Sequence, residues 1–489
     1  MRMWAQSHLC QKPQRAVSVL AAVFVLTFLI LSASQPANAL PAFARKYGLR
    51  CSACHESWPA LNNFGLKFRD NGYQLMNDRD SPVWQNPGYW PVTFRITPIW
   101  HRVSTPQQVD TYDSTTGAIT GSTTQRISST GFDLSGLDFH TGGILEKNFS
   151  FYVLPSSDST GAFHFESVNA RVDNIAGSSW LNVRLGKFEL NNLLSEKRTL
   201  WLTGNGGIYQ TYHFIPVNDG NTFGQMGDNQ LGMEYMGHSV DDKTRVSAAL
   251  LSSNDGSVGL ITGANSYSGF FTFDQAFDAG KMGTERVGAY AFVGEAATYY
   301  LTSGGVPLAG SGIGNKGFSR VGFYGQFYLG PHFDLNVVTQ HGSDNAYFGQ
   351  GYGSAIASDG NGTATCTTSS GCPPNNTPGT VLPPGSRAPT WNGYTFEARY
   401  VYSPQLIFKG VYEAERMSQQ ATPGTATNLG NINNYSIGYR YNPFMTSRAG
   451  FAYFGEFNLF QSANGPLTSS NKASYINTSE LLFGIDFDF

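Results

Sequence analysis

From about residue 92 to the end of the chain, apolar and polar residues alternate in a series of short runs. A period of two predicts β-strands, because successive side chains of a strand point to opposite faces. In the run 391–402, one face carries Tyr394, Phe396, Ala398, Tyr400 and Tyr402, and the other carries Thr395, Glu397 and Arg399. Two such faces fit a transmembrane barrel in which aromatic residues meet lipid and charged residues face a polar lumen. A soluble β-sandwich is the alternative, although it would place its charged face outward and use less tyrosine in its core.

The last run has the sharpest alternation. Its apolar face carries Leu481, Phe483, Ile485, Phe487 and Phe489, opposite Gly484, Asp486 and Asp488. A final aromatic strand of this kind resembles the signal that the outer-membrane barrel assembly machinery reads. We therefore predict an all-β fold in which 92–489 forms a transmembrane antiparallel β-barrel of about 16 strands, with 14 or 18 strands as alternatives.

The lengths of the connections predict how the barrel is oriented. Long polar connections at 342–390, 416–432 and 461–479 alternate with tight ones at 403–404 and 442–443. Outer-membrane barrels have long extracellular loops and short periplasmic turns. The end of the last strand and the segment before the barrel are therefore both expected on the periplasmic side. The stretch 190–206 breaks the alternation and is either an inward-folded constriction or an ordinary loop.

Composition excludes several classes of protein. Only 13% of the 489 residues are charged, against about 25% in ordinary soluble proteins. The aromatic content of 14% disfavours disorder. With 31 basic against 34 acidic residues, the chain has no basic excess with which to bind nucleic acid. After residue 31, no apolar run approaches the roughly 20 residues that a membrane-spanning helix needs.

The first 39 residues have the features of a secretory signal peptide. Arg2, Lys12 and Arg15 precede the apolar stretch 16–31, and the A-x-A sequence 37–39 follows it. A retained membrane anchor is the alternative, but the apolar stretch is short for a span. Export predicts an oxidising compartment, in which cysteine pairs form disulfides or bind cofactors. Together with the barrel, it predicts localisation in the outer membrane of a Gram-negative bacterium.

The four cysteines after the signal form two close pairs. Cys51, Cys54 and His55 make up the string C-S-A-C-H, which is the attachment motif of c-type haem. Two thiols at this spacing can add to the two haem vinyl groups, and the histidine that follows can bind the iron as an axial ligand. The alternatives are a redox dithiol, which would want a βαβ context, and a zinc half-site, which would need two further ligands.

The segment 40–91 is predicted to be a small helical unit around this motif. Residues 43–48 are expected to form a short helix closed by glycine, and a second helix after Pro59 is expected to carry an apolar stripe at helical spacing: Leu61, Phe64, Gly65 and Phe68. Several basic residues are candidates for contacts with haem propionates: Arg45, Lys46, Arg50, Lys67 and Arg69.

The sixth ligand of the iron has several candidates. Met76 is the local one, because it is the methionine of this segment and no second histidine occurs there. A His/Met pair would raise the reduction potential. A barrel histidine such as His101 or His140, or water, is the alternative. Because about 50 residues are few to enclose a haem alone, we expect the barrel to shelter the cofactor, with the segment plugging the lumen.

The two halves together resemble one known family. The C-S-A-C-H string just after a signal, the sequence N-x-F-G-x-x-F-x-x-N-G-Y at 62–73 and the barrel that follows resemble the outer-membrane monohaem cytochrome–porin fusions of iron-oxidising bacteria. The resemblance implies one covalent haem c, held by thioether bonds to Cys51 and Cys54 with His55 as axial ligand. It also implies electron transfer from extracellular Fe(II), or a similar donor, to a periplasmic c-type cytochrome. No barrel residue can be carried over, because the barrel sequence is generic.

A second hypothesis belongs to another class, a solute-conducting porin whose haem segment is structural or regulatory. The scattered Ser, His and Asp residues form no hydrolytic motif, so an iron:cytochrome oxidoreductase is the enzyme activity under consideration. The second cysteine pair, Cys366 and Cys372, lies in a Gly/Pro/Thr-rich connection and is predicted to form a disulfide.

Overall fold

The computed structural model describes residues 42–57, 60–85, 91–112, 115, 119–157, 160–192, 194–196, 201–214, 226–227, 229–252, 267–298, 300–301, 307–308, 314–343, 347–348, 355–356, 390–418, 431–445, 449–462 and 476–488. Among these residues, no helix is long and apolar enough to cross a membrane. The predicted signal peptide, Cys366, Cys372 and Phe489 lie outside the described residues.

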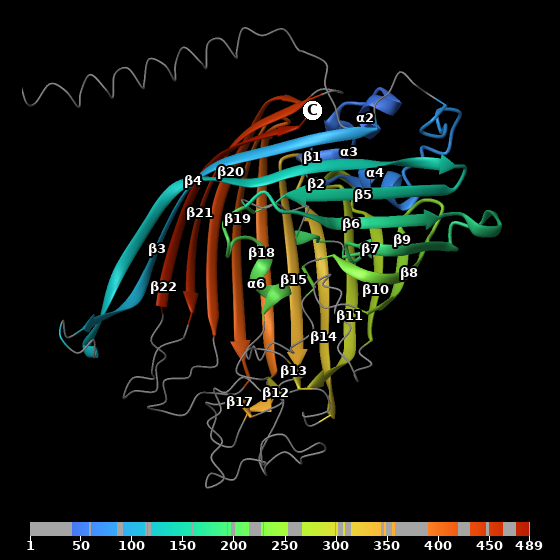
Figure 1. Cartoon of the computed structure of the whole chain (residues 1–489). Coiled ribbons are helices and arrows are strands. Elements are labelled where there is room, and N and C mark those ends of the chain that lie inside the picture. The colour runs from blue at the N-terminus through green and yellow to red at the C-terminus, as the bar shows by residue number, and fades with distance from the viewer. Residues whose placement is uncertain are drawn as a thin grey trace, which may run out of the picture.

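In the described part of the chain, 16 antiparallel strands form a closed barrel (Figure 1). Each strand pairs with its neighbours in sequence, and β22 pairs with β3 to close the ring. The prediction of an all-β barrel with 16 strands is therefore confirmed. The barrel strands are β3 (Val92–Tyr112), β4 (Ile119–Glu146), β5 (Phe149–Ser157), β6 (Phe163–Val172), β7 (Asn182–Phe188), β8 (Gln230–His238), β9 (Thr244–Leu251), β10 (Ser268–Asp278), β11 (Thr284–Thr298), β14 (Gly314–Tyr328), β15 (Phe333–Ser343), β18 (Thr390–Ser403), β19 (Leu406–Met417), β20 (Ile432–Met445), β21 (Gly450–Ser462) and β22 (Ile476–Asp488).

The remaining elements are short. Among the described residues, three strand pairs lie outside the barrel sheet: β1 (His55–Ser57) with β2 (Ala60–Leu61), β12 (Tyr300–Leu301) with β13 (Pro307–Leu308), and β16 (Tyr347–Phe348) with β17 (Ala355–Ile356). Single turns of 3₁₀-helix connect neighbouring strands, η1 (Ile175–Gly177) and η2 (Gly280–Met282).

The alternation of side chains follows the pattern expected from the sequence. On β18, Phe396 and Tyr400 are exposed on the outer wall, whereas Glu397 and Arg399 between them are buried inside. On β22, Phe483 and Ile485 face outward and Asp486 and Asp488 are buried. The inward charges pair across the strands: Arg95 with Asp138 and Asp486, Arg399 with Asp334, and Lys409 with Glu456. The charged face is therefore the inner one, which is opposite to a soluble sandwich.

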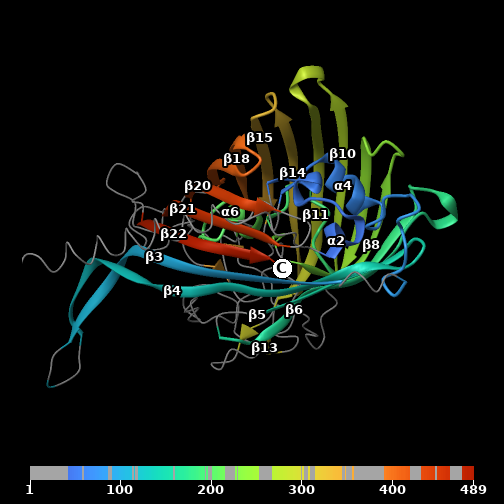
Figure 2. The same cartoon turned by 90° about the horizontal axis from the view of Figure 1, so that it is seen from above.

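The segment before the barrel contains α2 (Ala42–Tyr47), α3 (Cys51–Cys54), β1 (His55–Ser57), β2 (Ala60–Leu61) and α4 (Asn63–Asp70). These elements lie at the end of the barrel at which β22 ends (Figures 1 and 2). The first predicted helix is present and ends before Gly48, whose φ of 65° is the left-handed value that glycine adopts easily. β3 begins at Val92, where the alternating pattern begins in the sequence.

A second segment of the chain, here called the inward segment, folds into the barrel; its described residues are 190–192, 194–196 and 201–214. Leu190 and Leu194, after β7, and Tyr212 of α6 (Tyr209–His213) are buried in one apolar cluster with inward side chains of β10, β11, β14 and β15. Leu66 of α4 belongs to the same cluster, so the N-terminal segment and the inward segment meet inside the lumen. Of the two alternatives for 190–206, the inward fold is therefore the one observed.

Two local expectations need correction. α4 buries Gly65, Leu66 and Phe68, whereas Phe64 is 44% exposed. The predicted stripe is wrong at Phe64, because α4 packs against the turn at 51–54 on one side and faces the lumen on the other. It is also wrong at Leu61, which lies in the short strand β2 before the helix. The tight turn expected at 442–443 is also wrong: β20 continues to Met445 through a bulge between Tyr441 and Phe444. A bulge accommodates Pro443, which has no N–H for the ladder.

Candidate functional site

The C-S-A-C-H string folds as one helical turn followed by a short strand. α3 spans the two cysteines, and the N–H of Ala53 donates to the carbonyl oxygen of Arg50 at 2.9 Å. A helical turn brings residues three apart onto the same side, so Cys51 and Cys54 share a face. His55 begins β1 directly after the turn, with extended backbone angles. The local fold therefore presents two thiols and an imidazole from five consecutive residues.

The sequence N-x-F-G at 62–65 holds this turn in place. Asn62 caps α4 by accepting a hydrogen bond from the N–H of Gly65 at 2.9 Å, and its Nδ2 donates to the carbonyl oxygen of Ala53 at 3.0 Å. The N–H of Asn62 donates to the carbonyl oxygen of Cys54 at 2.9 Å. A Cβ on residue 65 would lie 2.2 Å from that same carbonyl oxygen. Glycine is therefore required for α4 to pack this closely on the cysteine turn.

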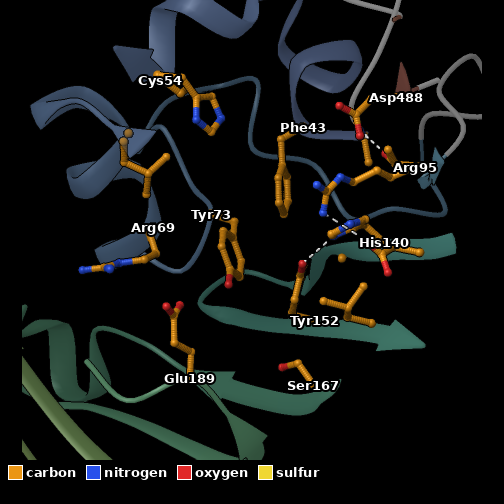
Figure 3. Close-up of a pocket in the computed structure, with 18 of the residues that line it drawn as sticks. Phe43, Cys54, Arg69, Tyr73, Arg95, His140, Tyr152, Ser167, Glu189 and Asp488 are labelled. Atoms are coloured by element: carbon orange, nitrogen blue, oxygen red, sulfur yellow. Dashed lines mark hydrogen bonds and ion pairs between the residues drawn. The ribbon is translucent and has the colours of Figure 1, made fainter. Parts of the chain in front are cut away.

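Both thiols and His55 line one cavity of about 510 Å³ at the mouth of the barrel. This volume lies within the range of about 300–1,000 Å³ that is typical of cofactor and ligand sites. The N-terminal segment contributes Phe43 and Tyr73, and the barrel wall contributes His140 and Tyr152 of β4 and β5. In Figure 3, Phe43 and Tyr73 lie between Cys54 and the His140–Tyr152 pair.

Burial controls the chemistry of the thiols. It raises the pKa of Cys51 to about 12, with a further rise from nearby Asp488, and it raises the pKa of Cys54 to about 11. The structure records both as thiols rather than as a disulfide. Because the thiolate is the reactive form of cysteine, these side chains are poor nucleophiles at neutral pH.

Aromatic rings form much of the wall of the cavity. The rings of Phe43 and Tyr73 stack with centroids 4.8 Å apart, and Phe68 meets Phe43 edge-on at 5.4 Å. Tyr73 follows Gly72, whose φ of 68° turns the chain after α4. A Cβ on Gly72 would lie 2.0 Å from a carboxylate oxygen of Asp173. The N-G-Y end of the motif therefore places an aromatic ring in the cavity by a turn that glycine allows.

Ion pairs fix α4 to the barrel wall. Asp70 pairs with Arg245 of β9 at 2.8 Å and with neighbouring Arg69 at 2.7 Å. Burial tends to raise the pKa of Asp70, but the two guanidinium groups outweigh it and hold that pKa well below its usual range. Arg171 of β6 donates to the carbonyl oxygens of Arg69 and Asp70 at 2.8 and 3.1 Å. The end of α4 is therefore bound to the barrel by charge as well as by packing.

The structure separates the candidates for the sixth ligand. Met76 is 53% exposed and is not one of the described residues that line the cavity. His101 of β3 is not among them either, whereas His140 is. Of the basic candidates, Arg50 and Arg69 line the cavity, Arg45 donates to the carbonyl oxygen of Val92, and Lys46 donates to that of Ser81.

Two inward carboxylates that sequence reasoning did not single out hold the inward segment. Glu456 of β21 accepts from the N–H groups of Leu202 and Thr203 at 2.8 and 3.1 Å. Glu413 of β19 accepts from the N–H groups of Gln210 and Thr211 at 3.4 and 3.2 Å. The signal for them was present, because both stand on the charged faces of alternating strands. Their partners lie more than 200 residues away and could not be identified from local pattern.

No family model matches the sequence, and no curated protein matches it either. Several solved structures are similar. They include an anion-selective porin from Comamonas acidovorans (11% identity, 81% of this chain and 98% of that one, TM-score 0.46), OprB of Pseudomonas putida (10%, 89% and 99%, 0.44) and the outer-membrane channel DcaP of Acinetobacter baumannii (12%, 81% and 97%, 0.41). The strand pairing itself, rather than these likenesses, establishes the barrel.

Proposed function

We propose that this chain is an outer-membrane protein that carries one covalently bound haem c at the periplasmic mouth of its barrel and transfers single electrons. The observation that carries the proposal is that Cys51, Cys54 and His55 of the C-x-x-C-H string line one cavity. The donor is a reduced extracellular species such as Fe(II), and the acceptor is a periplasmic c-type cytochrome. The predicted signal peptide and the lipid-type outer wall of the barrel support the location.

The residues present fit a haem. Cys51 and Cys54 would hold it by thioether bonds, His55 would bind its iron, and Phe43 and Tyr73 supply flat apolar walls. Arg50 is exposed at the rim of the cavity, where a propionate can reach it without burial of its charge. When bound, a haem supplies reversible one-electron chemistry. The chain's own residues would orient the group and keep it against the barrel.

Carboxylates and guanidinium groups of the described residues line the cavity in nearly equal number: Asp138, Glu166, Glu189, Glu196 and Asp488 against Arg50, Arg69, Arg95 and Arg184. These charges do not select a donor. Fe(II) is proposed because the N-terminal motif resembles that of the cytochrome–porin fusions of iron-oxidising bacteria. The periplasmic cytochrome would dock from outside the barrel mouth, close to Arg50.

The runner-up is a solute-conducting porin in which the N-terminal segment has a structural or regulatory role. The closed 16-stranded barrel favours it, because this architecture forms aqueous channels in outer membranes. Against it stands the apolar cluster that joins Leu66 of α4 to the inward segment inside the lumen. A wide channel would keep a polar interior.

The direct test of the proposal is covalent haem and its reduction by iron. The full chain, expressed with export and haem-attachment machinery, is expected to retain haem after denaturing electrophoresis. Cys54→Ser is expected to abolish that signal, while Ser52→Ala, in the variable position of the motif, keeps it. In both variants the barrel is expected to remain heat-modifiable in the outer membrane.

The substrate is tested separately by stopped-flow spectroscopy. When oxidised protein is mixed with Fe(II), the spectrum of reduced haem is expected to appear within the time that an oxidase needs for one catalytic cycle. The Cys54→Ser protein is expected to show no haem spectrum. Covalent haem without reduction by Fe(II) would retain the electron-transfer function but exclude this donor. A chain without covalent haem would favour the porin.

A further inference from the structure

The barrel wall contributes an unusual histidine to the cavity. His140 of β4 lines the same cavity as Cys51, Cys54 and His55. Its Nδ1 is hydrogen-bonded to the hydroxyl of Tyr152 at 2.8 Å, and its Nε2 is buried without a hydrogen-bond partner. The Nε2 atoms of His101 and His238 are also buried without a partner, so what distinguishes His140 is that it lines this cavity. One ring nitrogen is thus fixed, and the other is left for something that the protein atoms do not supply.

This arrangement is the one that metal-binding histidines use. A histidine that binds a metal commonly donates its second ring N–H to a neighbouring acceptor, which fixes both the tautomer and the orientation of the ring. The Tyr152 hydroxyl oxygen stands at that place for His140. In the tautomer in which Nδ1 donates to the hydroxyl oxygen of Tyr152, the lone pair of Nε2 would be available to a metal.

The competing side chains do not share these features. Met76 is exposed and lies outside the described lining of the cavity. His101 also has a buried Nε2 without a partner, but it is not among the residues that line the cavity. His213 is held by Glu196 at 2.7 Å and stacks on Tyr209, so its ring is already engaged.

We propose that His140 is the second axial ligand of the haem, opposite His55, and that Tyr152 positions it. The inference rests on the proposed function, because it requires the haem. It makes the iron a bridge between the N-terminal segment, which supplies His55, and the barrel wall, which supplies His140. It also predicts two imidazole ligands, and therefore a lower reduction potential than the His/Met pair that the sequence favoured.

The experiment compares the spin state and potential of the haem in purified full-length variants. The wild type is expected to give the low-spin spectrum of a bis-imidazole haem by optical spectroscopy and electron paramagnetic resonance. His140→Ala is expected to lose that signal and become high-spin, with the covalent haem retained, and added imidazole is expected to restore the low-spin form. His140→Met keeps much of the side-chain volume and a ligand atom, and is expected to raise the potential and to introduce the methionine–iron charge-transfer band.

Three further variants decide the assignment. His101→Ala, a matched loss of a barrel histidine with an unpartnered buried nitrogen, is expected to leave the spectrum unchanged, as is Met76→Ala. Tyr152→Phe is expected to stay low-spin and to shift the potential, since it removes the partner of Nδ1 and leaves the ligand. An unchanged spectrum in both His140 variants, or loss of the low-spin signal in Met76→Ala, would overturn the inference while leaving the haem in place. Absence of covalent haem from the wild type would instead reject the proposed function.

Discussion

Gly65 shows how one residue sets the distance between the cysteine turn and the helix that covers it. Its Cα faces the carbonyl oxygen of Cys54 so closely that an added Cβ would lie 2.2 Å from that oxygen. The same carbonyl accepts the N–H of Asn62, whose side chain caps α4. Cap, helix and cysteine turn therefore share one contact, and a change in one of them moves the others.

Gly65→Ala is expected to destabilise the N-terminal segment by about 1–3 kcal/mol, the usual cost of overpacking a closed contact. Hydrogen exchange of the α4 amides measures it, and exchange should be faster by the corresponding factor. Gly410→Ala in β19 is the matched control, because a Cβ there would have its nearest neighbour at 3.9 Å. Equal exchange in the two variants would show that α4 does not pack on Cys54 as described.

Residue-level chemistry also explains which parts of the site the sequence predicts. Cys51, Cys54 and His55 are predictable because their spacing carries the chemistry. The sixth ligand is not, because the sequence offers Met76, His101, His140 and water without a way to choose. His140 lies 85 residues from His55 in the sequence, and the structure shows that it lines the cavity with His55. The prediction of Met76 relies on nearness in sequence, and Met76 has a φ of 58° and is exposed in this structure.

At the scale of elements, the strands were predictable because period-two alternation is a direct consequence of strand geometry. The set of residues that α4 buries was less predictable than the strands. A helix packed on two sides buries more than one face, and its exposed Phe64 breaks the simple amphipathic pattern. The sequence allows two alternatives for 190–206, because the carboxylates that hold this segment, Glu413 and Glu456, lie on strands that are distant in sequence.

The docking of α4 on β9 is expected to weaken at low pH. The pKa of Asp70 is depressed in the folded state, where Arg245 and Arg69 outweigh burial, so its stabilisation is present above its unfolded pKa of about 3.9. It is lost as pH falls through the depressed folded value. Hydrogen exchange of the α4 amides between pH 5 and 2 measures this loss. After correction for the fall of the intrinsic exchange rate with pH, the α4 amides are expected to be less protected at the acid end.

A nearby carboxyl group acts in the opposite direction and in a different window. Burial and the charge of Asp70 raise the pKa of Asp242, in the turn before β9, to about 6. The stability that protonated Asp242 contributes to the folded state is therefore present below about pH 4 and lost as pH rises through 6. Asp70→Asn is expected to remove the loss of α4 docking at low pH. It is also expected to weaken docking at pH 7 by up to about 3–5 kcal/mol, because it breaks the 2.8 Å pair with Arg245 and leaves Asp274 at 3.9 Å as the remaining carboxylate of that guanidinium. If α4 docking still weakens at low pH in Asp70→Asn, the weakening belongs to another titrating group.

The connection 357–389 carries the prediction of a disulfide between Cys366 and Cys372, both outside the described residues. The ring would close only a few residues, and because closure entropy grows with ring size, it should constrain the loop with little effect on the barrel. Mass spectrometry after alkylation without reductant is expected to find neither thiol modified. Two alkylated cysteines in the mature protein would contradict the pairing.

For the whole molecule, the question is whether the barrel conducts solutes. Two segments occupy the described lumen: the N-terminal segment, through Leu66, and the inward segment, through Leu190, Leu194 and Tyr212. An apolar cluster inside the ring leaves less room for water than the polar lining of an open porin. The barrel would then be a wall around a sheltered redox site, and its closure would serve the haem rather than transport.

This view predicts that the purified full chain is nearly silent in a planar lipid bilayer. The double variant Glu413→Ala and Glu456→Ala is expected to raise the open conductance, since it removes the acceptors of four N–H groups in the inward segment. Each orphaned donor costs about 1–3 kcal/mol, enough to release the segment from the wall. Glu146→Ala, at an exposed position next to a turn, is the control and should stay silent. A large conductance in the wild type, unchanged when the haem is absent in Cys54→Ser, would mean that the lumen is open and that this chain is a solute-conducting porin.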